Sequence, residues 1–146
     1  MWREIVLWLF VINLGIALGA GLYEHRVVIS QWTDIPPSQW PNTGLMFWAY
    51  VTTVPLTLLT LISLFAAWTA TQPMRTWYLA AAAIIVIERL VTFTYFIPTM
   101  LRLSGMEAGR EVSAGLTQWL TVNHGRHLLT FSGWLAALRA LSLLRS

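Results

Sequence analysis

Long apolar runs constrain this chain more than any other feature of its sequence. Crossing the hydrocarbon core of a membrane, roughly 30 Å thick, takes about 20 consecutive and mostly apolar residues in a helix. Segments of this kind occupy residues 5–23, 46–68, 77–97 and 127–144 of the 146 residues. The sequence therefore predicts an all-α fold: a four-helix transmembrane bundle with antiparallel neighbours, forming a single integral membrane domain over residues 1–146.

The composition agrees with a membrane protein and argues against other classes. Only 10% of the residues are charged and 57% are hydrophobic, whereas a soluble domain carries about 25% charged residues. Cys is absent, which excludes disulfides, thiolate metal sites and a cysteine nucleophile. The net charge of +3 comes without a basic run, so the sequence predicts no nucleic-acid partner.

The orientation in the membrane depends on a weak asymmetry. The Arg residues divide equally between the two sides of the predicted bundle, so the positive-inside rule does not decide it. On the side away from the termini, however, the Arg residues have acidic neighbours, namely Glu24, Glu107 and Glu111. We therefore expect both termini to face the cytoplasm, in a bacterial inner membrane.

The connections between the apolar runs differ in character. The link at residues 69–75 is short, so the second and third helices should be adjacent and antiparallel. Residues 24–45 contain three prolines and predict an ordered, turn-rich loop. The last connection is expected to begin at Pro98, and helical spacing returns near Glu107, which starts the fourth helix before it enters lipid.

Antiparallel threading brings polar residues to one depth of the bundle. The first and third helices end, and the second and fourth begin, on the same side. Each helix carries one polar stripe there, so the stripes should converge on an interior cavity. We expect its substrate-binding residues to be Glu24, Tyr50, Thr53, Tyr95, Trp119, Asn123, Arg126 and Trp134. The Thr stripe of the second helix also suits helix–helix contact, and the nine Trp residues suit membrane anchoring.

Glu88 and Arg89 lie deeper in the predicted bundle. A charge at such depth costs at least about 2.5–3.5 kcal/mol on insertion scales, so a compensating partner is expected. Neighbouring residues of a helix differ in direction by about 100°. We therefore expect Arg89 to pair with Glu24 rather than with Glu88, and both a structural ion pair and a functional site stay open.

Two kinds of chemistry fit these polar residues. Haem or a metal held through His25 and His127 is permitted by the spacing, but the paired Glu-x-x-His motifs of di-iron bundles are missing. A cofactor-free site fits better, with His127, Arg89 and Glu88 as catalytic residues. His127 would act as the base, while Arg89 and Arg126 would hold an enolate or phenolate.

Short motifs give the chain a family resemblance. The first helix is rich in Gly and Ala and ends in Glu24, the third runs into Phe96-Ile97-Pro98, and the fourth opens with Trp119, Asn123 and Arg126. This layout resembles the anthrone-oxygenase-like family of small four-helix membrane proteins, most of which have no assigned function. The resemblance implies the fold and a cofactor-independent anthrone-type oxygenase. The family more commonly has His at the position of Asn123, and Asn residues around the proline turn, which are absent here.

Two classes of function follow. In the first, the chain is an integral membrane oxidoreductase or oxygenase acting on a lipophilic aromatic or quinone-like compound. In the second, it is a non-catalytic small membrane subunit, or a binder of lipid, haem or quinone in a larger assembly. The expected partners are membrane lipid and a lipophilic small molecule, together with further copies of the chain in a homo-oligomer.

Overall fold

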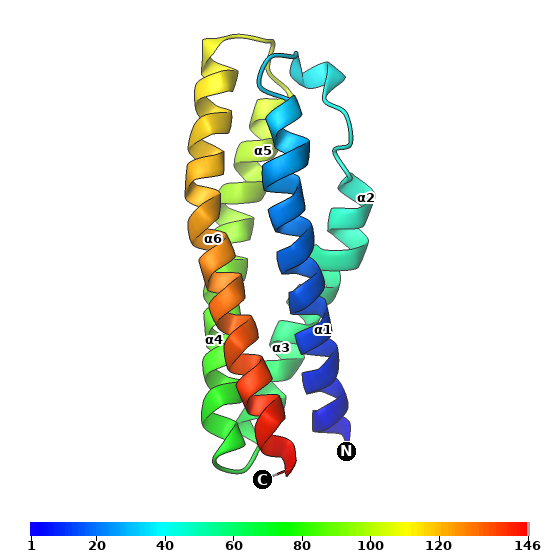
Figure 1. The fold of residues 1–146 in the computed structure, drawn as a ribbon, viewed down its shortest axis with the longest axis vertical. Helices are drawn as coiled ribbons and strands as arrows, with labels where there is room; N and C mark the ends of the chain where they lie inside the picture. Colours follow the sequence, from blue (N-terminus) through cyan, green and yellow to red (C-terminus); the bar gives the residue numbers. More distant parts are fainter. Residues whose placement is uncertain (146) are drawn as a thin grey trace.

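The chain folds into a bundle of long helices with both termini at one end (Figure 1). The computed structural model describes residues 1–145, which are helical apart from short turns and connections. Four long helical segments run side by side in this range, and this confirms the all-α, four-helix fold. Their closest neighbours follow the ring order α1, α3, α4, α6, so every segment packs against two others.

Each of the first three segments is built from consecutive helical elements. The first comprises α1 (Trp2–Tyr23), the π-helical turn η1 (Glu24–Val28) and the 3-10 turn η2 (Ile29–Gln31). The second comprises α2 (Leu45–Phe47), the π-helical turn η4 (Trp48–Thr53) and α3 (Val54–Trp68). The third comprises α4 (Met74–Val91), the π-helical turn η5 (Thr92–Phe96) and α5 (Ile97–Ser104).

The fourth segment is the long helix α6 (Arg110–Ser142), followed by the 3-10 turn η6 (Leu143–Arg145). Its start at Arg110 agrees with the helical spacing that the sequence shows from about Glu107. The connection between the first two segments contains the 3-10 turn η3 (Pro37–Gln39). As expected, a short link joins α3 to α4, and these two helices pack against each other.

Three of the four segments are long and apolar enough to cross a membrane: Trp2–Gln31, Leu45–Trp68 and Met74–Ser104. The second begins one residue before the predicted span, whereas the third extends beyond its predicted span at both ends, mainly past residue 97. Helix α6 is less clearly apolar, because its 33 residues include charged and polar side chains along much of its length. Many large apolar side chains are exposed on the bundle, among them Trp8, Leu58, Phe65 and Leu128.

The sequence-based expectation that a connection begins at Pro98 is wrong. The third segment continues through Pro98, which occupies one of the first two positions of α5, and ends at Ser104. A proline has no N–H to donate to the carbonyl four residues before it. The π-helical turn η5 lies directly before α5, and there Ile97 N–H donates to the carbonyl of Thr92, five residues back. The wider turn lets the helix pass the proline.

The second segment passes Pro55 in a similar way. The turn η4 precedes α3, and Val54 N–H donates to the carbonyl of Ala49. Pro55 leaves the carbonyl of Val51 without its usual helical donor. The side-chain amide of Asn13 on α1 donates to that carbonyl at 3.0 Å. A buried polar residue of one helix thus satisfies a backbone group that a proline of another has freed, as an apolar environment requires.

Small residues allow α4 and α6 to approach closely. Ala81, Ala82, Ala137 and Ala140 are fully buried between helices. A Cβ atom added to Gly133 of α6 would lie 2.5 Å from Ile85 Cδ1 and 2.8 Å from Ile85 Cγ1. Close packing of this kind is one of the contributions that hold helices together in lipid.

We expect Gly133→Ala to destabilise the bundle, because the new methyl group overlaps the buried Ile85 side chain. Overpacking of this kind costs about 1–3 kcal/mol. The measurement is the thermal unfolding midpoint of the detergent-solubilised protein. Gly125→Ala in the same helix is the control, since nothing lies within 4 Å of its added Cβ. Equal midpoints for the two variants would contradict the close α4–α6 contact.

Candidate functional site

A cavity of about 210 Å³ lies in the half of the bundle away from the termini. We call it the site cavity. Its apolar lining residues comprise the aromatic residues Trp32, Trp40, Trp48, Phe96 and Trp119 and the aliphatic residues Leu45, Ile97, Met100 and Leu101. Its polar lining residues are Glu24, Thr43, Thr53, Thr92, Ser104 and Arg126. An apolar wall with a few polar groups is typical of small-molecule binding sites.

All three π-helical turns contribute to the site cavity. Glu24 comes from η1, Trp48 and Thr53 come from η4, and Thr92 and Phe96 come from η5. Such turns make up well under 1% of residues in globular proteins and often occur at functional sites. Their coincidence at one cavity, on three different helical segments, singles out this part of the bundle as the candidate site.

The connection between the first two segments covers the site cavity with a pair of stacked indoles. Trp32 and Trp40 have ring centroids 4.8 Å apart and an interplanar angle of 9°. Trp32 Nε1 donates to the carbonyl of Pro41 at 2.8 Å, and Trp40 Nε1 donates to the carbonyl of Trp32 at 3.2 Å. Both rings are buried. The predicted loop is shorter than residues 24–45, because residues 24–31 continue the first helical segment. The turn-rich connection that remains forms part of the cavity wall.

Arg126 places a cation at the site cavity. Its guanidinium carbon lies 4.7 Å from the ring centroid of Phe96 and 5.6 Å from that of Trp119. Trp119 is itself fixed by a hydrogen bond of 3.2 Å from its Nε1 to the carbonyl of Phe96. The guanidinium makes no hydrogen bond within residues 1–145, and the acids that interact with it electrostatically are Glu88 and Glu24. Its N–H donors are therefore free to bind a ligand oxygen.

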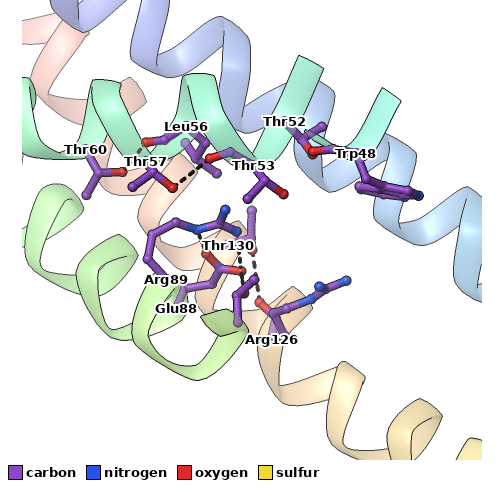
Figure 2. A network of polar contacts seen from close by, with 11 residues as sticks. Trp48, Thr52, Thr53, Leu56, Thr57, Thr60, Glu88, Arg89, Arg126 and Thr130 are labelled. Carbon is purple, nitrogen blue, oxygen red and sulfur yellow. Dashed lines mark hydrogen bonds and ion pairs between the residues drawn. The ribbon is translucent and has the colours of Figure 1, made fainter. Parts of the chain in front are cut away.

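Glu88 and Arg89 form a bidentate ion pair on α4, shown in Figure 2. Arg89 Nε donates to Glu88 Oε2 at 2.6 Å and Nη2 donates to Oε1 at 2.8 Å. Thr92 Oγ1 also donates to Oε1, at 2.9 Å. The expected pairing of Arg89 with Glu24 is wrong. Although the two Cβ atoms point in different directions, both side chains are long enough to meet, and a two-point contact with a carboxylate suits the guanidinium.

The Thr residues of the second segment bond to their own helix. Thr57 Oγ1 donates to the carbonyl of Thr53 at 2.6 Å, and Thr60 Oγ1 donates to that of Leu56 at 2.6 Å (Figure 2). Thr52 Oγ1 donates in the same way to the carbonyl of Trp48 at 2.9 Å. These hydroxyl groups therefore donate their hydrogen bonds within their own helix. Hydrogen bonds to another helix, one of the roles expected for these Thr residues, are not made by these hydroxyl protons.

Four polar residues gather between η1 and α6, and we call them the histidine cluster: His25, His124, His127 and Asn123. The Asn123 amide nitrogen lies 3.3 Å from His25 Nδ1 and 3.4 Å from His127 Nε2. The His25 ring centroid lies 4.6 Å from that of His124 and 5.5 Å from that of His127. Gly21 leaves room for His127, because a Cβ there would lie 3.0 Å from Nε2. When both rings are neutral, the amide can donate one hydrogen to each.

The histidine cluster does not suit the metal or haem suggested by the sequence. In residues 1–145, no group of three or more His, Asp or Glu side chains is placed to hold a metal ion. The amide of Asn123 stands between ring nitrogens of His25 and His127. Haem iron held by these two residues would have to take that position, so the amide would first have to move away.

The structure brings four of the predicted site residues to the site cavity: Glu24, Thr53, Trp119 and Arg126. The other seven lie elsewhere. Asn123 and His127 are in the histidine cluster, Glu88 and Arg89 bind each other, and Tyr50 is 66% exposed. Tyr95 packs edge-on against Phe96 at 5.1 Å, and the indole nitrogen of Trp134 is next to Gly15 of α1.

Most of the aromatic residues at the site cavity do not follow from the sequence pattern. Trp32, Trp40 and Trp48 suit membrane anchoring by their positions in the sequence, yet all three line the site cavity. Two signals were present: the prolines around Trp40 indicate an ordered loop, and Pro55 and Pro98 indicate irregular helix turns. Neither signal shows which side chains of the loop or of the irregular helix turns point into the bundle.

Comparison of the chain with protein-family models, with curated proteins and with solved structures gives no match.

We expect Glu88→Leu to destabilise the protein strongly, by about 3–5 kcal/mol, because it leaves the Arg89 cation buried without its partner. The double variant Glu88→Leu/Arg89→Leu should recover most of this loss, since it removes both charges. The measurement is the unfolding midpoint of each purified variant in detergent. A double variant no more stable than Glu88→Leu alone would show that Arg89 is not the principal partner of Glu88.

Proposed function

We propose that this chain is an integral membrane protein whose site cavity binds a flat, lipophilic aromatic compound through an oxygen atom held by Arg126. The observation that carries the proposal is the Arg126 guanidinium, which lies over two aromatic rings and lines a cavity with several indole walls. An aromatic ligand stacks on indole walls. A quinone, enolate or phenolate oxygen accepts the hydrogen bonds that the guanidinium has to give.

The size of the site cavity limits the ligand. Its volume of about 210 Å³ is below the roughly 300–1,000 Å³ of typical small-molecule pockets. A head group of one to three fused rings suits this space better than a larger ligand. An alkyl tail, as on membrane quinones, would extend from the cavity into lipid.

The membrane setting also belongs to this proposal. Three segments are apolar enough to cross, and we place α6 as a fourth crossing helix. Its buried residues Asn123, His127 and Thr130 would face the other helices rather than lipid. The cytoplasmic placement of the termini and the bacterial inner membrane stay predictions.

The favoured activity is oxidoreductase or oxygenase chemistry on the bound ring compound. Glu24 and Arg126 line the same cavity, so a proton acceptor and a cation are available to form and hold an enolate or phenolate. Trp119 and Arg126 also carry the resemblance to the anthrone-oxygenase-like family, and both line the cavity. These two residues support membership of that family, as a proposal.

A non-catalytic binder of quinone or lipid is the second candidate. The observation that favours it is the pairing of the residues expected to be catalytic. Arg89 and Glu88 bind each other, and His127 contacts Asn123 outside the site cavity. Binding of a ring compound is common to the enzyme and to a quinone binder, and oxygen consumption with anthrone separates these two.

We expect Arg126→Gln to weaken binding of 1,4-naphthoquinone by at least about tenfold, because a charge-assisted hydrogen bond contributes about 1.5–3 kcal/mol. Binding is measured by quenching of tryptophan fluorescence in the detergent-solubilised protein, since Trp side chains surround the cavity. Arg102→Gln is the matched control, because Arg102 is exposed on α5 and does not line the cavity. Equal affinities of the Arg126→Gln variant and the unmodified protein would contradict the proposal.

A further inference from the structure

A second cavity, of about 340 Å³, adjoins the site cavity. We call it the vestibule. It lies between the end of the first segment and the start of the second, and its lining includes Tyr23, Gln31, Asn42 and Phe47. Gln31 and Asn42 are exposed and carry amide groups, so the opening of the vestibule suits water. This contrasts with the aromatic wall of the site cavity.

Glu24 and Trp48 line both cavities. They come from the π-helical turns η1 and η4, which form opposite sides of the boundary. The Trp48 indole and the Glu24 carboxyl group therefore lie at the boundary of the two cavities. One titratable side chain stands there between a water-accessible space and an apolar space.

Within residues 1–145, Arg126 is the one cation that lines the site cavity together with Glu24, and few other charged or titratable groups surround Glu24. Arg126 of α6 interacts with it electrostatically, while Glu88 of α4 is already bound to Arg89. On its own turn, His25 points to the histidine cluster with His124 and His127 of α6, and Arg26 is exposed. From the second segment, η4 contributes Trp48 and Thr53 but no charged side chain.

We propose that Glu24 exchanges protons between a ligand in the site cavity and water in the vestibule. This inference rests on the proposed function, because it needs a ring compound bound beside Arg126. The carboxylate takes a proton from an acidic O–H, or from a C–H next to a ring carbonyl. The bonding electron pair stays on the ligand as a phenolate or enolate, whose oxygen Arg126 holds.

The second step restores Glu24. The carboxylic acid gives its proton to a water molecule in the vestibule, which becomes hydronium, and the carboxylate is formed again. No electron transfer is involved, and each step runs in reverse when the ligand is reprotonated. The other buried acid is not available for this role, because Glu88 accepts two hydrogen bonds from Arg89 and one from Thr92.

The test follows deuterium incorporation at the acidic carbon of anthrone, a flat ring ketone, in D₂O without oxygen. The purified protein should accelerate this exchange over buffer. Glu24→Gln should reduce the acceleration by at least about 100-fold, because a general base contributes about 10²–10⁴-fold. Anthrone binding, measured by tryptophan fluorescence, should stay within about threefold of the unmodified protein. Glu107→Gln, an exposed acid outside both cavities, should exchange at the unmodified rate.

A second variant tests the path to water. Ala20 lines the vestibule but not the site cavity. Ala20→Phe should fill part of the vestibule and slow the exchange at least about tenfold, with anthrone binding retained. Unchanged exchange in this variant would overturn the path through the vestibule.

The outcomes separate the two proposals. Absence of anthrone binding to the unmodified protein would overturn the proposed function. Binding without accelerated exchange, or equal exchange in the protein and its Glu24→Gln variant, would overturn the role of Glu24 and leave the binding proposal standing.

Discussion

The structure depends on how backbone carbonyl groups are satisfied in helices that pass through an apolar environment. Pro55 and Pro98 remove donors from two helices, and neither helix ends there. A π-helical turn precedes each proline, and Asn13 donates to the carbonyl of Val51 that Pro55 frees. Wider turns displace side chains from regular helical register. Two of the three π-helical turns around the site cavity therefore arise where a proline has removed a backbone donor, while η1 has no proline beside it.

The buried charges follow a related constraint. An ion in a low-dielectric interior needs a partner, and Glu88 and Arg89 meet this need within one helix. Arg126 is stabilised differently, by two aromatic faces and by the more distant acids Glu88 and Glu24. That arrangement leaves its hydrogen-bond donors available, whereas Arg89 donates from both Nε and Nη2 to Glu88. The difference explains why the site is assigned to Arg126 and Glu24, although the sequence pointed to His127, Arg89 and Glu88.

Periodicity and length predicted the four helical segments from the sequence, but not where the first and third segments end. The four helical segments, the short α3–α4 link and the early start of α6 follow from the apolar runs and the helical spacing. Side-chain direction near the prolines could not be predicted, because a regular 3.6-residue helix was assumed where π-helical turns occur. For that reason Tyr50 was placed in the interior, while it is exposed, and Trp48 was missed. The pairing of adjacent Glu88 and Arg89 was missed because their Cβ directions were considered without the reach of the side chains.

A crystal structure of the protein with 1,4-naphthoquinone would test the central claim most directly. The account predicts the ring system inside the site cavity, against Trp119, with one quinone oxygen about 2.7–3.2 Å from a nitrogen of Arg126. The ligand bound elsewhere, or the site cavity closed by rearranged Trp side chains with Arg126 paired to an acid, would contradict it.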